Sequence, residues 1–364
     1  MRHLRLLSLV VPLVLGLVLT SALPAHADPS KSRPGRTVEV RVLTIGDSVT
    51  QGVAGDYTWR FRLQRSLAAV QSKSIDAAGR TRAYDFVGNR TAVYDQQLKT
   101  EVEDYADPRF DRDHAAVLGM RASSLRYDLA ELVRTTDPHV IVLSVGLNDL
   151  LKGSAPTAVV PHVERIINEA RAAAPGVAIV LSHQTPTWVA GVNDLNRLLT
   201  QVASRLDRRG ARVDIAAVPP VYQHGKDTWD RYHPNQVGEI KLAHEVHLSL
   251  QRLGFAARPN PVNPATFPAA GPPRALADVR VSAAPRGFAV SWSAPAGVYG
   301  AQVSYRNVTT GGPWVVHQGA PVMGRTTRVQ ALKPGNTYEV RVVPARGAAV
   351  SATRYTVVQR VRAG

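Results

Sequence analysis

Residues 43–52 read Leu-Thr-Ile-Gly-Asp-Ser-Val-Thr-Gln-Gly, and the rest of the chain is organised around this stretch. Residues 38–45 are rich in β-branched side chains and predict a strand that runs into it. Gly46 stops the strand and lets the backbone turn sharply. The turn would present the hydroxyl group of Ser48 at the sheet edge, where a substrate can reach it. A plain strand-to-helix turn with a capping serine would show the same pattern, so the remaining motifs must decide.

Length and composition indicate a two-domain globular protein. The chain has 364 residues, of which 45% are hydrophobic, and no cysteine. That length allows two domains with cores of their own. Without cysteine, neither disulfide bonds nor thiolate metal sites are available.

The N-terminal residues 1–27 predict a signal peptide and therefore a secreted, extracellular protein. They begin with Arg2 and Arg5, continue with an apolar run over residues 6–19, and end in Ala-His-Ala at residues 25–27. An uncleaved membrane anchor is the alternative, but the apolar run is shorter than the ~20 residues that a spanning helix needs. We therefore expect no stable membrane span.

Strands and helices alternate over residues 36–253, which we interpret as one catalytic domain. The expected strands cover residues 38–45, 83–87, 139–145, 177–182 and 212–218. Thr58 is expected to cap one helix, and Ser123 or Ser124 to cap a second helix that continues through Arg134. Three further expected helices cover residues 156–174, 192–208 and 236–252. This alternation predicts an α/β fold with a parallel sheet covered on both faces. A doubly wound sheet of this kind has the strand order 2-1-3-4-5.

The segment at residues 89–120 predicts a long irregular loop. Its acidic cluster over residues 101–113 lacks the ligand spacing of a calcium loop, so a solvated loop is the favoured interpretation.

Residues 254–273 contain six prolines and predict a semi-rigid linker. Short alternating strands follow at residues 279–281, 288–292, 301–305, 313–317, 327–329, 338–343 and 353–358. This pattern predicts an all-β sandwich over residues 274–362. Residues 274–364 hold 12 basic and 2 acidic side chains. That excess favours binding to anionic cell-wall polymers or acidic polysaccharides, with solubility as the alternative and no specific nucleic-acid partner expected.

Three further motifs follow predicted strands, so the fold would bring them to the same sheet edge as Ser48. They are Gly88, Gly146-Leu147-Asn148-Asp149, and the run from Asp230 to Asn235. A nucleophilic serine needs a base and a group that orients the base. His233 is the candidate base, and Asp230 can reach its other ring nitrogen if the segment makes a helical turn.

The same motifs offer donors for an oxyanion hole. The backbone N–H groups of Ser48 and Gly88 and the side-chain amide of Asn148 can stabilise a developing negative charge. A plain turn at Asn148 and a helix cap at Asp230 are the structural alternatives. The joint occurrence of all motifs at strand ends favours a catalytic site that needs no cofactor and no metal.

Together these motifs resemble the SGNH (GDSL-type) hydrolases over residues 38–253. The resemblance implies a flavodoxin-like three-layer fold and ester hydrolysis. It also implies a Ser48, His233 and Asp230 triad, and an oxyanion hole of Ser48, Gly88 and Asn148. One departure is Arg231, which stands where many members have glycine.

Two further resemblances concern the substrate and the second domain. Residues 85–89 and 114–121, with Gly119 and Arg121, resemble the acetyl-xylan-esterase branch of the family. The stretch Leu-Lys-Pro-Gly-Asn-Thr-Tyr at residues 332–338, with Trp292 upstream, resembles a fibronectin type III module.

The sequence therefore predicts a secreted serine esterase that removes short acyl groups, above all acetyl, from a carbohydrate such as an acylated polysaccharide. Trp188 and Trp229 are either sugar-stacking platforms or buried residues. One alternative function is a GDSL-type lipase or phospholipase. The other is a non-catalytic cell-wall-binding protein.

Overall fold

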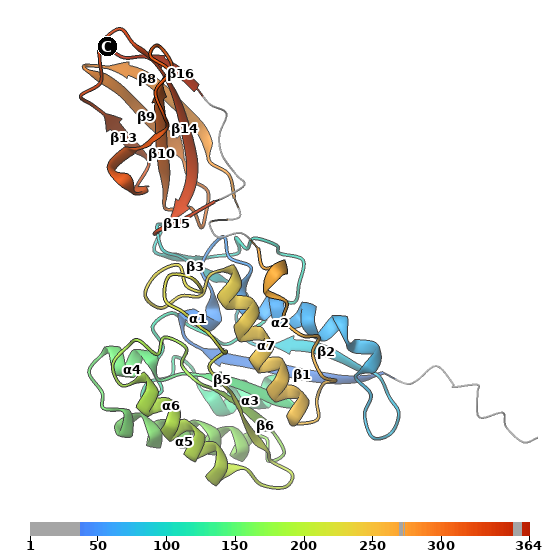
Figure 1. Ribbon diagram of the computed structural model, residues 1–364. Helices are drawn as coiled ribbons and strands as arrows, with labels where there is room; N and C mark the ends of the chain where they lie inside the picture. The colour runs from blue at the N-terminus through green and yellow to red at the C-terminus, as the bar shows by residue number, and fades with distance from the viewer. Residues whose placement is uncertain (1–36, 269–271, 273, 352–358) are drawn as a thin grey trace, which may run out of the picture. The chain divides into compact units, whose positions relative to one another are not determined.

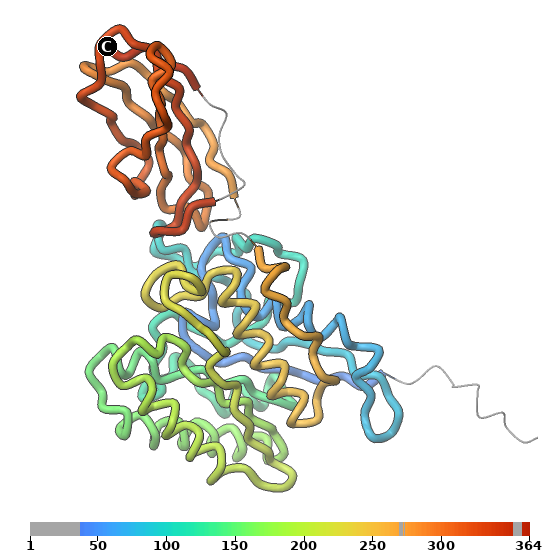
Figure 2. The backbone as a smooth tube through the Cα atoms, viewed as in Figure 1, coloured from blue at the N-terminus to red at the C-terminus, as the bar shows by residue number. Residues whose placement is uncertain are grey.

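The computed structural model describes residues 37–268, 272, 274–351 and 359–364 (Figure 1, Figure 2). The predicted signal peptide and the strand expected at residues 353–358 lie outside these residues.

Five parallel strands form the sheet of the N-terminal part. They are β1 (Val38–Gly46), β2 (Arg82–Val87), β5 (Val140–Ser144), β6 (Ala178–Ser182) and β7 (Val213–Ala216). Their order, β2-β1-β5-β6-β7, is the predicted 2-1-3-4-5 order, which is therefore confirmed. Leu43 of β1 pairs with Val87 of β2 and with Ile141 of β5. The carboxyl end of β1 consequently lies between the carboxyl ends of β2 and β5.

Helices cover both faces of this sheet, as Figure 1 shows. One face is covered by α2 (Thr58–Ala69) and α7 (Gln236–Arg252), and the other by α3 (Leu129–Thr136), α5 (Pro156–Ala173) and α6 (Val192–Leu206). Successive side chains of a strand point to opposite faces. Val42 accordingly belongs to the core that contains Trp59 of α2, whereas Leu43 belongs to the core that contains Val163 of α5. The α/β fold class is thus confirmed.

The helix expected to start at Ser123 or Ser124 starts later. Residue Asp128 caps α3, and its carboxylate accepts the N–H of Glu131. The N–H of Ser123 is instead donated to the carboxylate of Asp149 at 3.0 Å. This hydrogen bond holds the segment before Asp128 in a turn.

The segment at residues 89–120 contains a hairpin that the sequence did not predict. Its strands are β3 (Val93–Asp95) and β4 (Thr100–Val102). Acidic side chains of the predicted cluster pair with arginines, as in Glu101 with Arg90, Glu103 with Arg112, and Asp107 with Arg109. Among the described residues, no group of three or more His, Asp or Glu side chains is arranged to hold a metal ion.

The C-terminal module is all-β and antiparallel, as predicted. One sheet contains β10 (Gly300–Asn307), β11 (Val315–Val316), β12 (Val322–Met323), β14 (Thr337–Arg346), β15 (Ala349–Val350) and β16 (Gln359–Arg362). The other sheet contains β8 (Ala277–Ala284), β9 (Gly287–Ser293) and β13 (Thr326–Val329). Phe288 and Trp292 of β9 share a core with Val303 of β10 and Val340 of β14. Short 3₁₀ turns lie at Gln71–Lys73, Pro264–Thr266 and His317–Gly319.

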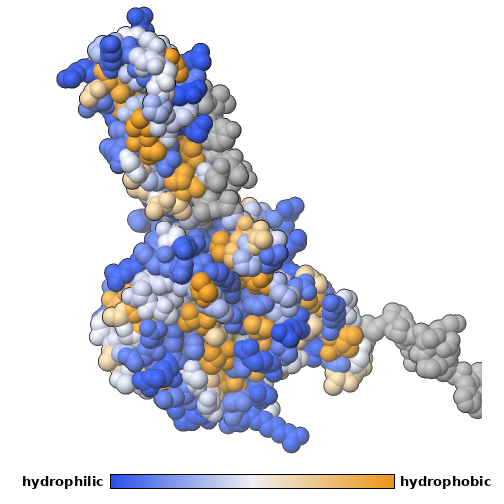
Figure 3. Space-filling model, in the orientation of Figure 1, coloured by the Kyte–Doolittle hydropathy of each residue, from blue (hydrophilic) through white to orange (hydrophobic). Residues whose placement is uncertain are grey.

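Within the described ranges, no helix is both long enough and apolar enough to cross a membrane. On the face shown in Figure 3, hydrophobic side chains form separate patches between hydrophilic ones.

Candidate active site

Ser48 is the first residue of a single helical turn, α1 (Ser48–Gln51), that follows β1 directly. A Cβ atom at Gly46 would lie 2.2 Å from the side chain of Thr50 and 2.9 Å from the carbonyl oxygen of Ser144. Only glycine therefore fits at this turn. Asp47 caps the turn, because its Oδ1 accepts the N–H of Val49 at 3.0 Å.

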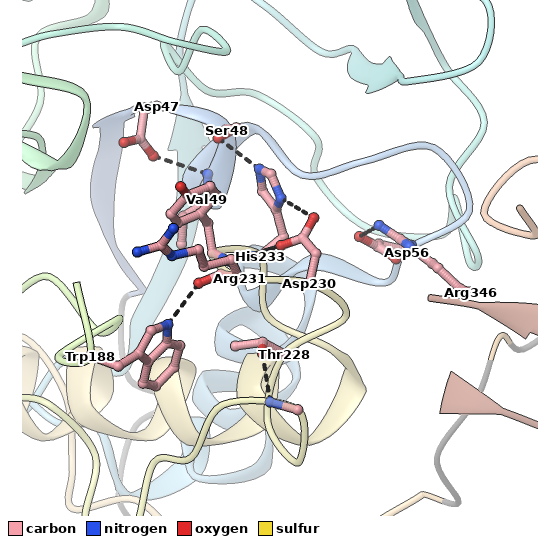
Figure 4. A network of polar contacts seen from close by, with 12 residues as sticks. Asp47, Ser48, Val49, Asp56, Trp188, Thr228, Asp230, Arg231, His233 and Arg346 are labelled. Carbon is pink, nitrogen blue, oxygen red and sulfur yellow. Dashed lines mark hydrogen bonds and ion pairs between the residues drawn. The ribbon is translucent and has the colours of Figure 1, made fainter. Parts of the chain in front are cut away.

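A loop between β7 and α7 brings a histidine and a carboxylate to this serine (Figure 4). His233 Nε2 lies 3.0 Å from Ser48 Oγ, and His233 Nδ1 lies 2.8 Å from Asp230 Oδ2. The other carboxylate oxygen, Asp230 Oδ1, accepts the N–H groups of Tyr232 and His233, each at 2.8 Å.

The carboxylate of Asp230 fixes the loop in a bend rather than in the helical turn that the sequence suggested. Arg231 is exposed and is not among the residues with positive φ. The bend does not require glycine at this position, so the departure from the family pattern leaves the geometry intact.

Electrostatics keep Asp230 ionised. Partial burial opposes its charge, but hydrogen bonding and the interaction with His233 outweigh burial and hold the pKa of Asp230 well below its usual value. A carboxylate in this place orients the imidazole and stabilises it when it takes up a proton.

Two of the three predicted oxyanion donors make no hydrogen bond among the described residues. They are the backbone N–H groups of Ser48 and Gly88. A Cβ atom at Gly88 would lie within 2.2–2.5 Å of backbone atoms of His114. Glycine is therefore needed here because the backbone of His114 passes directly against it.

The third predicted donor, Asn148, lies in the short helix α4 (Leu147–Leu151) after β5. Its Nδ2 donates to Asp47 Oδ2 at 2.8 Å and to the carbonyl oxygen of Met120 at 3.2 Å. The structure thus ties Asn148 to the residue before Ser48, but both amide hydrogens already have acceptors. Burial raises the pKa of Asp47 to about 6.

The tryptophans differ in their surroundings. Trp229 is only 6% exposed, so the interpretation as a buried residue holds and a sugar-stacking platform is excluded there. Trp188 is half-buried, donates from Nε1 to the carbonyl oxygen of Arg231 at 2.9 Å, and stacks on Tyr222. Trp188 thus holds the loop that carries His233.

The cavities differ in size and position. A cavity of about 10 Å³ is lined by Ser48, His233, Asp56 and Glu239 among others. Two larger cavities, of about 660 and 290 Å³, are lined by neither Ser48 nor His233. The cavity of about 660 Å³ lies between α7 and the proline-rich linker and is not part of this site.

Fold and site together define a protein of the α/β class with a candidate nucleophilic serine at the carboxyl edge of its five-stranded parallel sheet. The model of the GDSL-like lipase/acylhydrolase family matches residues 44–239. The chain belongs to this family and is a carboxylic ester hydrolase.

Solved structures with similar chains are distant in sequence. A carbohydrate esterase family 3 protein from Talaromyces cellulolyticus is 22% identical and has a TM-score of 0.46, covering 59% of this chain and 98% of its own. A family 3 carbohydrate esterase from Clostridium thermocellum is 20% identical and has a TM-score of 0.47, covering 60% of this chain and 98% of its own. The FN5 domain of Drosophila Lar is 17% identical and has a TM-score of 0.21, covering 25% of this chain and 96% of its own. The comparison with curated proteins found no match.

Sequence reasoning missed three buried charged residues next to this site, Asp56, Glu239 and Arg346. Asp56 and Arg346 form an ion pair although 290 positions separate them. No motif or spacing connects them, so only the folded chain reveals the pair.

Proposed function

We propose that the protein is a serine esterase that removes short acyl groups, above all acetyl, from carbohydrate. The observation that carries this proposal is the hydrogen-bonded series from Ser48 through His233 to Asp230, at 3.0 and 2.8 Å. The family supplies the reaction class.

In the proposed reaction, Ser48 Oγ attacks the ester carbonyl carbon while its proton passes to His233 Nε2. The bond between the carbonyl carbon and the alcohol oxygen then breaks, and that oxygen takes the proton from His233. This leaves an acyl ester on Ser48. A water molecule then attacks the same carbon and gives a proton to His233. The acid leaves as the Ser48 oxygen recovers its proton.

The proposed oxyanion hole consists of the N–H groups of Ser48 and Gly88 and the side-chain amide of Asn148. The first two are free to donate. Asn148 must turn one N–H from Asp47 or Met120 toward the carbonyl oxygen when the substrate binds.

Substitution Ser48→Ala tests the nucleophile. We expect turnover of an activated acetyl ester to fall by ~10³–10⁶ with an unchanged melting temperature. Ser154→Ala, at an exposed serine, is the matched control and should keep wild-type turnover. Wild-type turnover by Ser48→Ala would overturn the assignment of the nucleophile. Absence of ester hydrolysis by the wild-type protein would instead favour the alternative of a non-catalytic cell-wall-binding protein.

The cavity that Ser48 and His233 line is too small to hold a long acyl chain. Its volume of about 10 Å³ is close to that of one water-sized probe, and the larger cavities do not open onto Ser48 or His233. We expect kcat/KM on a series of acyl esters to be highest for acetyl and to fall with chain length. A maximum at eight carbons or longer would favour the alternative, a lipase or phospholipase.

The carbohydrate part of the proposal rests on the resemblance to the acetyl-xylan-esterase branch. We expect acetate release from acetylated xylan to exceed that from acetylated lipids. We also propose that residues 1–27 are removed on secretion. The mass of the protein recovered from the medium checks this, and a chain that starts at Met1 would contradict it.

We further propose that the C-terminal module resembles fibronectin type III and binds an anionic polysaccharide. The register places Arg306, Glu339 and Arg360 side by side across three strands. The guanidinium groups of Arg306 and Arg341 lie over the ring of Trp314 at 5.0 and 4.6 Å. An aromatic ring among arginines on one sheet face suits a carboxylated sugar chain.

A further inference from the structure

A buried ion pair joins the C-terminal module to the loop that leaves the candidate nucleophile. Arg346, the last residue of β14, donates from Nη1 to Asp56 Oδ1 at 2.5 Å and from Nη2 to Oδ2 at 3.4 Å. The Arg346 side chain is 3% exposed and the Asp56 side chain is 5% exposed. Asp56 lies five residues beyond the end of α1, so the pair holds the segment that continues directly from Ser48 (Figure 4).

The same guanidinium group also contacts the loop that carries His233. It lies over the ring of Trp229, 4.7 Å from the ring centroid, and over the ring of Tyr299 at 4.9 Å. Trp229 directly precedes Asp230, and its N–H is donated to the carbonyl oxygen of His233 at 2.9 Å. One side chain of the module therefore touches both loops of the candidate site.

Close backbone contacts hold the two loops against the module. A Cβ atom at Gly55 would lie 2.3 Å from the carbonyl oxygen of Ala296, and one at Gly347 would lie 2.8 Å from the carbonyl oxygen of Trp229. Both glycines have positive φ, so any side chain there would also strain the backbone. These close backbone contacts hold the segment that carries Arg346 against both loops.

The catalytic groups lie within electrostatic reach of this pair. Asp56 shares the cavity of about 10 Å³ with Ser48 and His233. Burial raises the pKa of Asp56, and the Arg346 and His233 side chains oppose that rise.

We propose that Arg346 is a positioning residue for the catalytic pair, because it holds the loop after Ser48 and the loop before His233 in register. The module is then part of the esterase site and does more than bind a polymer. This inference rests on the proposed roles of Ser48 and His233.

The first test compares kcat and KM for an acetyl ester in Arg346→Met and wild type. A displacement of catalytic groups by about 1 Å can cost ~10²-fold in rate, so we expect kcat to fall by ~10–100-fold while KM stays within threefold. Arg346→Lys keeps the charge but loses the two-pronged geometry, and it should recover part of kcat. A folded Arg346→Met protein with kcat within twofold of wild type would overturn the proposal.

A double variant separates positioning from mere stability. Asp56→Asn with Arg346→Met removes both buried charges, so its melting temperature should exceed that of Arg346→Met alone. We expect its kcat to remain at least tenfold below wild type, because the restraint on both loops is still missing. Full recovery of kcat would show that only the unpaired charge mattered. The double variant also serves as the test if Arg346→Met does not fold.

Arg274→Met is the matched control. Arg274 also joins the C-terminal part to the N-terminal part, pairing with Asp104 at 2.5 Å and donating to the carbonyl oxygen of Tyr105 at 2.7 Å. The guanidinium group of Arg274 contacts neither loop of the site, and it is the backbone carbonyl of Asp104, not the paired carboxylate, that accepts the N–H of Gly55. We therefore expect kcat to stay within twofold of wild type. An equal loss of kcat in Arg274→Met would contradict a specific role of Arg346. The Ser48→Ala result distinguishes the two proposals. Activity retained in Ser48→Ala would refute the nucleophile and the positioning of it together, whereas loss of activity in Ser48→Ala with unchanged kcat in Arg346→Met would refute the positioning alone.

Discussion

At the scale of single residues, Asn148 combines observed structural hydrogen bonds with a proposed role as an oxyanion donor. Its amide is bonded to Asp47 and to the carbonyl oxygen of Met120. These bonds fix the amide beside the turn that carries Ser48, where the proposed oxyanion would form. Pre-positioned donors of this kind cost little reorganisation during the reaction.

Substitution Asn148→Ala should lower kcat by ~10²–10³, because one donor to the oxyanion is lost. The measurement is steady-state turnover of an acetyl ester, with circular dichroism as a check of folding. Asn193→Ala, at an exposed asparagine on α6, is the control and should behave as wild type. A folded Asn148→Ala protein that loses less than threefold in kcat would remove Asn148 from the oxyanion hole.

The sequence could place Ser48 and the candidate oxyanion donors because each one directly follows a strand whose end the fold fixes. Ser48, Gly88 and Asn148 lie after β1, β2 and β5, which are neighbours in the sheet. The bonds made by the Asn148 amide could not be predicted, because Asp47 and Met120 come from other loops. Whether Asp47 and Met120 come close to Asn148 depends on how the folded loops pack, and the spacing of residues in the sequence does not predict this packing.

At the scale of elements, Glu239 links α7 to the start of α2, which follows the loop after Ser48. Glu239 Oε1 accepts the N–H of Thr58 at 3.0 Å, and this bond anchors the start of α2. The sequence placed a capping residue at Thr58, but Thr58 has φ of 73° and its partner comes from α7. The N-cap position belongs to Tyr57, without a side-chain cap.

Glu239 should make stability depend on pH. Burial, and then the nearby charge of Asp56, raise the pKa of Glu239 from 4.5 to about 8. Between those values the folded chain holds a proton that the unfolded chain releases. This contribution to stability is therefore full below about pH 4.5 and is lost as the pH rises to about 8.

The variant Glu239→Gln stays neutral at every pH, so its melting temperature should fall less than that of wild type between pH 5 and pH 8. Thermal unfolding at several pH values measures the difference. Glu131→Gln, at an exposed glutamate of α3, is the control and should follow the wild-type curve. Parallel curves for Glu239→Gln and wild type would contradict a protonated Glu239.

Element boundaries were predictable where apolar runs define a buried strand, as for β5 and β6. They were not predictable where a distant carboxylate competes for a backbone N–H. The start of α3 was misplaced for this reason, because Asp149 takes the N–H of Ser123.

At the scale of the whole molecule, the charge is concentrated in the C-terminal module. Glu339 is 9% exposed in its side chain and pairs with both Arg306 and Arg360, which are 43% and 70% exposed. Arg362 lies two residues beyond Arg360 and so faces the same side of the sheet. The arginines outnumber the single carboxylate on this face.

The double variant Arg360→Gln with Arg362→Gln should weaken binding of the full chain to a carboxylated polysaccharide by at least about threefold at low salt. Co-sedimentation with the polymer at two salt concentrations measures it, and Glu339 keeps Arg306 as its partner. Arg208→Gln with Arg209→Gln removes the same charge from the N-terminal part and should leave binding unchanged. Equal loss in both variants, or preferential binding to nucleic acid, would refute a specific polysaccharide face.

The ion pair between Asp56 and Arg346 also has a consequence for biosynthesis. The two residues are 290 positions apart, so the earlier one is synthesised long before its counter-charge exists. Until the late strand that ends at Arg346 has formed, a carboxylate beside the serine has no cation to neutralise it. The growing polypeptide therefore cannot complete its esterase centre part by part, and full activity should appear only when translation and folding have reached the far end of the molecule.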